Sequence, residues 1–222
     1  MIADDTVRTP IKQTGENVYA RLDRLLTVWV WGVACLFACG LVLADPDLWG
    51  HTLYGLRAWD QGVLAERTDP FSYTAPHAVW INHEWLTELQ LGLTFRYFGN
   101  PGLWMWRNAW VLVIFACAAS ELRRQRANLA ASTLLLLYGA MCVSQFVVFV
   151  RPQVPTLALF TLSLTILKRF SDQVSRREIW LLPILMALWV NLHGGFLAGL
   201  GVIGVYAALD VVKRLRSGWL EL

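Results

Sequence analysis

The residues best suited to chemistry in this chain are two aspartates, Asp45 and Asp47, that follow the first apolar segment. They open a stretch, continuing to Trp85, in which carboxylates, histidines and tryptophans are dense. A charged, aromatic loop at the edge of a membrane lies where the phosphates of lipids are presented. The sequence therefore predicts a site for chemistry on a lipid-linked substrate in this loop.

Polar residues beyond the loop supply candidates for substrate binding. Arg151, in Arg151-Pro152-Gln153, lies between two apolar segments, where a guanidinium can bind a lipid phosphate. Asn191 and His193 come at a later boundary of the same kind and are candidates to line a cavity.

Several of these residues also have a purely structural interpretation. Asp45 suits the N-cap of a helix with Pro46 at the first helical position, and Asn82 suits the N-cap of a later helix with an acidic first turn. Asp69-Pro70 is more typical of a turn than of a site. Arg151 can extend from a helix end towards water, Pro152 can open the next helix, and Gly194-Gly195 suits a tight reversal.

The spacing of the potential ligands and of the cysteines gives little support for a metal site or a disulfide bond. The candidate nitrogen and oxygen ligands His51, His83, Glu84 and His193 do not follow a known metal-binding spacing. All four cysteines fall in apolar segments without a C-x-x-C pair. We therefore predict no cofactor, and a divalent metal has no support from the sequence.

The elements that must position these residues are membrane helices. The chain of 222 residues is 56% hydrophobic and only 16% charged, with a mean hydropathy of +0.46, whereas soluble domains contain about 25% charged residues. The predicted fold class is an all-α, polytopic helical membrane protein with an uncleaved first helix. We expect six spans, at Leu25–Ala44, Leu103–Ser120, Leu129–Val150, Val154–Leu167, Ile179–Leu192 and Phe196–Val212.

Two shorter helices are expected in the loop after the first span. The segment Leu86–Phe98 carries Glu88, Gln90 and Arg96, which favour an interfacial helix over a crossing. Apolar residues from Trp49 onwards follow a helical spacing that Gly62 would end.

The distribution of basic residues fits six spans and predicts their orientation. With this number of spans, 14 of the 19 Lys and Arg residues fall on the side of the N-terminus, which the positive-inside rule identifies as cytoplasmic. The predicted organisation is a cytoplasmic tail at 1–24, a membrane domain at 25–212 with an outer loop at 45–102, and a cytoplasmic tail at 213–222. The acidity of the outer loop argues against a nucleic-acid partner.

This arrangement resembles the N-terminal half of the GT-C-fold glycosyltransferases. The resemblance covers roughly residues 20 to 215: a first span ending in an acidic pair, a long outer loop, the turn His83-Glu84-Trp85-Leu86 before a short helix, and a span ending in Arg123-Arg124. These enzymes use polyprenyl-phosphate-linked sugars and include protein O-mannosyltransferases, aminoarabinose transferases and an Rgt-like group. The sequence departs from their pattern in the proline between Asp45 and Asp47.

The resemblance implies an inverting transfer of a sugar from a polyprenyl-phosphate donor to an extracytoplasmic acceptor at a bacterial inner (plasma) membrane. One of the catalytic candidates, Asp45 or Asp47, would be the general base on the acceptor hydroxyl. Arg151, or less directly Arg107, would stabilise the leaving phosphate. The acceptor would lie against His51, His83 and Glu84.

A competing hypothesis is a membrane protein without catalytic activity, such as a transporter subunit or a protein that binds lipid-linked sugars without turnover. Transporters tend to carry ionisable residues near the middle of the bilayer and to contain repeated halves. Neither feature is evident in this sequence, which favours the enzyme. The sequence predicts neither the sugar, the acceptor nor the oligomeric state.

Overall fold

The structure is a computed structural model that describes residues 42–64, 67–75 and 78–220, together with isolated positions between 18 and 40. The predicted tail at 1–24 and most of the predicted first span, Leu25–Ala44, lie outside the described residues.

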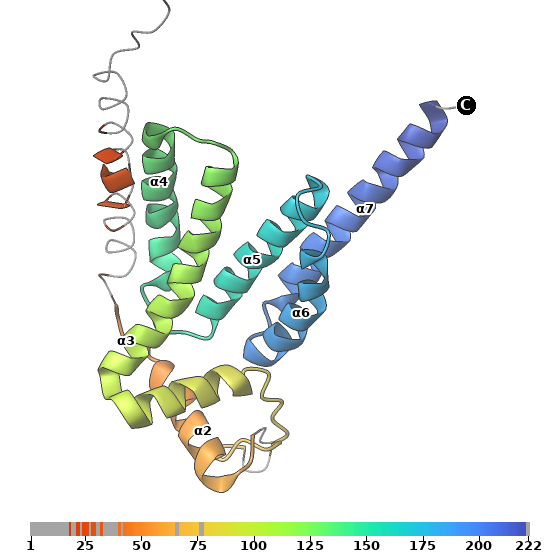
Figure 1. The fold of residues 1–222 in the computed structure, drawn as a ribbon. Helices are drawn as coiled ribbons and strands as arrows, with labels where there is room; N and C mark the ends of the chain where they lie inside the picture. Colours follow the sequence, from red (N-terminus) through yellow and green to blue (C-terminus); the bar gives the residue numbers. More distant parts are fainter. Residues whose placement is uncertain are drawn as a thin grey trace, which may run out of the picture.

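The described part of the chain is helical, as the composition predicts, and contains no strand (Figure 1). Two isolated β-bridges, Leu43 with Phe149 and Thr68 with Val79, hold connecting segments together. The elements are α2 (Leu48–Gln61), α3 (Trp85–Arg124), α4 (Leu129–Val147), α5 (Gln153–Ser171), the 3-10 helix η1 (Glu178–Trp180), α6 (Leu181–Leu192) and α7 (Phe196–Leu220).

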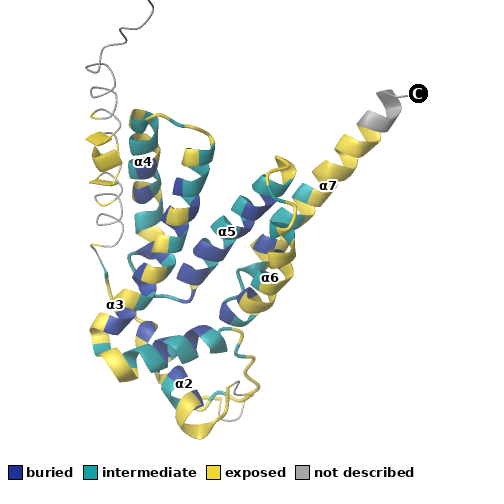
Figure 2. Cartoon of the chain, in the orientation of Figure 1, coloured by how far each residue is buried: buried dark blue, intermediate teal, exposed yellow. Residues whose placement is uncertain are grey.

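Among the residues that the structure describes, three helices are long and apolar enough to cross a membrane. They are Trp85–Arg124, Leu129–Val147 and Phe196–Arg216, and Glu178–Leu192 is apolar but shorter. Large apolar side chains are exposed on α4 and along α7 (Figure 2), as in helices that face lipid. Examples are Leu134, Tyr138, Met141, Leu197 and Val205.

Helix α3 bends sharply and has two limbs that point in different directions (Figure 1). Gly99 lies at the bend with φ 60° and ψ −152°, a backbone conformation that glycine adopts without a steric penalty. Pro101 follows and cannot donate a backbone hydrogen bond to the preceding turn. The first limb, Trp85–Phe98, corresponds to the short helix predicted at Leu86–Phe98, and the second contains the predicted span Leu103–Ser120.

Charges are separated between the two ends of the bundle. The α3–α4 connection, the α5–α6 connection and the end of α7 lie at one end (Figure 1). This basic end carries, within residues 121–128, 168–180 and 210–216, ten Lys and Arg residues against four carboxylates. The opposite, acidic end holds α2, the bend of α3 and the turns before α5 and α7, with Asp45, Asp47, Asp60, Asp69, Glu84 and Glu88.

Helix α2 packs unusually closely on the first limb of α3 through two glycines. A Cβ atom on Gly55 would lie 1.8 Å from the backbone oxygen of Glu88, and one on Gly92 would lie 2.5 Å from the backbone nitrogen of Leu56. Gly62 ends α2 in the left-handed conformation, as predicted. The close crossing brings the side chains of α2 directly against Glu88.

The second limb of α3 packs against α4 and α5 around Val111, Phe115, Ala140 and Val154. Arg107 is fully buried in this region, where its Nε donates to the Val147 carbonyl and its Nη1 to Asn108. Arg107 thus ties α3 to the end of α4, and its proposed binding role has no direct support from these contacts.

Candidate active site at the acidic end

The candidate site lies at the acidic end, where α2, the start of α3 and the end of α6 meet. Two hydrogen bonds attach α3 to α6: Trp85 Nε1 donates to Asn191 Oδ1 at 2.9 Å, and Thr87 Oγ1 donates to the Leu192 carbonyl at 2.7 Å. The glycine crossing fixes α2 on the other side. Together these contacts bring residues near positions 51, 84 and 193 into one cluster.

Glu84 is the centre of the cluster and contacts three histidines. Its Oε1 lies 3.4 Å from His193 Nε2 and 3.5 Å from His83 Nε2, and its Oε2 lies 3.8 Å from His51 Nδ1. The Glu84 side chain is only 14% exposed. Four of the six residues predicted to bind substrate are therefore neighbours in space.

Glu88 lies one helical turn after Glu84 and contacts the cluster through His51. It is buried, and its Oε1 lies 3.0 Å from His51 Nδ1. Asn82 Nδ2 donates to its other oxygen at 2.5 Å. His51 is therefore held between two carboxylates, with Glu88 as the nearer partner.

His193 is oriented by the backbone and by Thr156 of α5. Its Nδ1 accepts the N–H of Gly195 at 2.9 Å and lies 3.0 Å from Thr156 Oγ1, which itself accepts from Trp189 Nε1 at 2.9 Å. Because Nδ1 acts as an acceptor, the proton of the neutral imidazole is on Nε2, the atom that faces Glu84. His193 therefore presents an N–H to Glu84 Oε1.

The surroundings shift the pKa values of these groups in different directions. Burial raises the pKa of Glu84, Glu88 adds to the increase, and the charges of His51 and His83 oppose it. Burial lowers the pKa of His193, and the charges of His83 and His51 lower it further. Burial also disfavours the charged form of His51, but the hydrogen bond to Glu88 and the nearby carboxylates outweigh it and raise the pKa of His51.

The buried carboxylate of Asp45 forms an ion pair with Arg151, whose side chain is partly exposed. Its Oδ2 accepts from Arg151 Nε, and its Oδ1 accepts the backbone N–H of Asp47 at 2.9 Å. Burial opposes ionisation of Asp45, but the bonds from Arg151 and Asp47 and the charges of Arg151 and His51 together lower its pKa. The effect of His51 on this pKa links the ion pair electrostatically to the Glu84 cluster.

The N-cap role predicted for Asp45 is wrong. Helix α2 begins at Leu48, with Asp47 at the N-cap position and no side-chain cap, and Pro46 lies before the helix. The Asp45 carboxylate nevertheless makes a bond of the capping type, because its Oδ1 accepts the backbone N–H of Asp47 while its Oδ2 pairs with Arg151. Asp47 itself is exposed at the start of α2.

The N-cap predicted at Asn82 is also placed differently. Helix α3 begins at Trp85, with Glu84 at the N-cap position and no side-chain cap. Asn82 accepts the backbone N–H of Glu84 at 3.1 Å while donating to Glu88. Its side chain therefore orders the segment that carries Glu84 instead of capping the helix.

The Arg151 side chain is partly exposed although Asp45 holds its Nε. The side chain is 40% exposed and lies over the ring of Phe149, with Cζ 5.2 Å from the ring centroid. Helix α5 begins at Gln153, with Pro152 at its N-cap position. Arg151 is thus a cation held by Asp45 on a side chain that is partly exposed.

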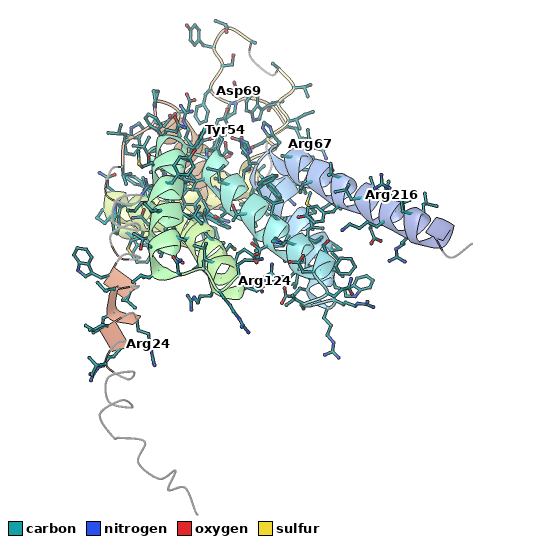
Figure 3. The ribbon with its side chains drawn as sticks, turned by 90° about the horizontal axis from the view of Figure 1, so that it is seen from above. Arg24, Tyr54, Arg67, Asp69, Arg124 and Arg216 are labelled. Carbon is teal, nitrogen blue, oxygen red and sulfur yellow. The ribbon has the colours of Figure 1, made fainter. Side chains whose placement is uncertain are left out.

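Asp69 forms a turn, as its Asp-Pro sequence predicts. Its Oδ1 accepts from the backbone N–H of Phe71 at 2.9 Å and from Tyr54 Oη at 2.7 Å (Figure 3). Tyr54 also stacks on Trp80. The pairing of Tyr54 with Asp69 anchors the loop to α2.

Two members of the site, Glu88 and Thr156, were not among the predicted site residues. Glu88 follows Glu84 by four residues and so shares its helix face, a signal that the sequence does contain. Thr156 lies in an apolar segment, and nothing in its spacing points to His193. Among the residues that the structure describes, no group of His, Cys, Asp and Glu has the geometry of a metal site.

Comparisons with known proteins do not identify the chain: no family matches the sequence, and neither a curated protein nor a solved structure matches it.

Proposed function

We propose that this chain is a membrane glycosyltransferase, or the membrane part of one, that transfers a sugar from a polyprenyl-phosphate donor to an acceptor hydroxyl on the extracytoplasmic side. The observation that carries the proposal is Glu84, a partly buried carboxylate with a raised pKa that contacts three histidines at the acidic end. Carboxylates whose pKa is shifted by burial and by specific charged neighbours cluster at functional sites.

Glu84 is the better general base of the available carboxylates. Asp45 forms an ion pair with Arg151 and its pKa is lowered, which makes its carboxylate a weak proton acceptor. Glu84 has a higher proton affinity, and His193 directs an N–H at one of its oxygens, which fixes the orientation of the carboxylate. This assigns to Glu84 the role that the resemblance implied for Asp45 or Asp47.

Arg151 is the proposed ligand of the donor phosphate. Asp45 holds its Nε, so the guanidinium is oriented before the substrate binds, and the exposed part of the side chain can donate to phosphate oxygens. The net charge of the Asp45–Arg151 pair is zero, but the fixed geometry places hydrogen-bond donors towards the ligand. Asp45 is therefore a positioning residue in this proposal.

The proposed reaction is a single displacement. The acceptor oxygen forms a bond to the anomeric carbon while its proton passes to Glu84. The bond between the anomeric carbon and the phosphate oxygen breaks, and the polyprenyl phosphate leaves with the electron pair, stabilised by Arg151. Attack opposite to the leaving group inverts the anomeric configuration.

The proposed orientation follows the separation of charge along the bundle. The basic end would face the cytoplasm, in keeping with the positive-inside rule, and the cluster would face outwards. Six crossings, with the first limb of α3 and α2 lying along the outer surface, would place the cluster at the depth of lipid phosphates. Three helices in the described part of the chain are apolar and long enough to cross, which supports this arrangement in part.

Glu84→Gln tests the assignment, with Asp47→Asn as the matched control. In membranes supplied with a polyprenyl-phosphate sugar, E84Q should reduce sugar transfer by about 10²–10⁴-fold, the usual contribution of a general base. D47N should stay near the wild-type rate because Asp47 is exposed and outside the contacts of Glu84. Transfer by E84Q at the wild-type rate would refute the assignment, and donor binding without transfer by the wild type would favour a binding protein.

A further inference from the structure

A cavity at the basic end is not used by the proposed reaction. It has a volume of about 580 Å³ and lies between the end of α5, η1 with the start of α6, and the middle turns of α7. The Glu84 cluster lies at the opposite end of the same helices (Figure 1). Ala207, Leu209 and Lys213 line the cavity and are also exposed, so the cavity opens to the surroundings.

The lining changes from apolar to polar along the cavity. Leu167, Leu182 and Ile203 lie on the side towards the middle of the bundle, whereas Gln173 and Lys213 lie towards its basic end. Such a gradient matches an amphiphile, with its chain among the leucines and its headgroup at the polar end.

Two aromatic residues indicate the depth of the cavity in a membrane. Trp180 and Tyr206 both line it, and Trp180 is 77% exposed. Exposed tryptophan at the end of membrane helices is favoured at the level of the headgroups. Helix α7, which forms one wall, is among the helices able to cross a membrane.

The charges around the cavity favour an anionic headgroup. Asp210 lines the cavity, but its carboxylate is paired with Arg214 Nε at 2.8 Å. Glu178 nearby is paired with Arg169 at 3.4 Å. Lys213 has no ion pair within the part of the chain that the structure describes, and the basic end as a whole has an excess of positive charge.

We propose that this cavity binds an anionic phospholipid of the cytoplasmic leaflet, with one acyl chain between α6 and α7 and its phosphate at Lys213. The inference requires that the chain lies in a membrane with its basic end towards the cytoplasm, and it is independent of the proposed transfer reaction. The bound lipid would fill the space between α7 and the rest of the bundle.

Native mass spectrometry of the purified full chain, titrated with palmitoyl-oleoyl phosphatidylglycerol or phosphatidylcholine, tests the proposal. The wild type should prefer the anionic lipid by about fivefold, since one Lys near the headgroup contributes about 1 kcal/mol. Lys213→Gln should abolish the preference and leave binding of phosphatidylcholine unchanged.

A pair of tryptophan substitutions on α7 tests whether the lipid occupies the cavity. Ala207→Trp fills the cavity and should reduce binding of phosphatidylglycerol by about tenfold. Ala208→Trp, at the neighbouring exposed position outside the lining, should bind as the wild type does. Equal binding of the two lipids by the wild type, or equal binding by the two tryptophan variants, would overturn the proposal. If A207W does not fold, the lipid preference of the Lys213 variants tests the proposal instead. Lys213→Gln should lose the preference for phosphatidylglycerol over phosphatidylcholine, and Lys213→Glu should reverse it.

Discussion

At the scale of single residues, the carboxylates of the acidic end differ in their partners and in their pKa values. Asp45 is buried against Arg151 and has a lowered pKa, whereas Glu84 is half-buried among histidines and has a raised pKa. Glu88 holds His51 in place. The same functional group therefore acts as an anchor for a cation in one position and as the proposed proton acceptor in another, because the neighbours differ.

The histidines predict a specific pH dependence for the proposed transfer. The positive charge of His51 lowers the pKa of Glu84, so His51→Gln should raise that pKa. Because a general base must be deprotonated, the acidic limb of the kcat/KM profile should move to higher pH in H51Q.

The control for this profile is Arg57→Gln, which removes a positive charge from α2 that is not among the charges affecting Glu84. R57Q should leave the acidic limb in place. A limb that moves to lower pH in H51Q, or that moves equally in R57Q, would contradict the electrostatic account.

At the scale of the elements, the close crossing of α2 and α3 determines whether the cluster can form. Gly55→Ala would place a methyl group against the Glu88 carbonyl, which is backbone and cannot rotate away. We expect G55A to lower the free energy of unfolding by about 1–3 kcal/mol, as overpacking does, and to separate His51 from Glu88.

Gly50→Ala on the same helix is the matched control, because a Cβ there meets no atom within 4 Å. Thermal unfolding in detergent should show a lower Tm for G55A and an equal or higher Tm for G50A, since alanine favours the helix. Similar Tm values for the two variants would show that the crossing tolerates a side chain.

The helices themselves were largely predictable from the sequence, because apolar segments, Gly62 and the polar residues of Leu86–Phe98 are local signals. The predicted spans from Leu103 onwards all fall on helices, with α4 ending at Val147 instead of Val150. What local signals could not supply is the pairing of Asp45 with Arg151, which are 106 positions apart. The local N-cap pattern of Asp45 therefore predicted its contact with the backbone before α2, but neither the helix start at Leu48 nor the ion pair with Arg151.

The candidate site was predictable in part for the same reason. His51, His83, Glu84 and His193 could be selected by residue type, but the glycine crossing that unites them depends on tertiary packing. Thr156 could not be selected, because its contact with His193 depends on how α5 meets α6.

At the scale of the whole molecule, the helical bundle has carboxylates and histidines at one end and an excess of positive charge at the other. The acidic end holds the Glu84 cluster and the Asp45–Arg151 pair, and the basic end holds the cavity proposed to bind lipid. This polarity places the proposed reaction and the proposed lipid site in opposite leaflets.

Thiol labelling tests the polarity in a variant whose four native cysteines are replaced by alanine. A membrane-impermeant maleimide should modify Asp47→Cys in intact cells and Gln125→Cys only after lysis, because these exposed positions lie at opposite ends. The reverse pattern would place the cluster in the cytoplasm and remove the basis for an outer acceptor.

The most direct measurement of the central claim is mass spectrometry of the lipids that co-purify with the wild type and with E84Q. We expect a polyprenyl phosphate or its glycosylated form in the wild type. The glycosylated form should be enriched in E84Q, which would bind the donor through Arg151 without transferring the sugar. The absence of any polyprenyl phosphate from both samples would refute the proposed function.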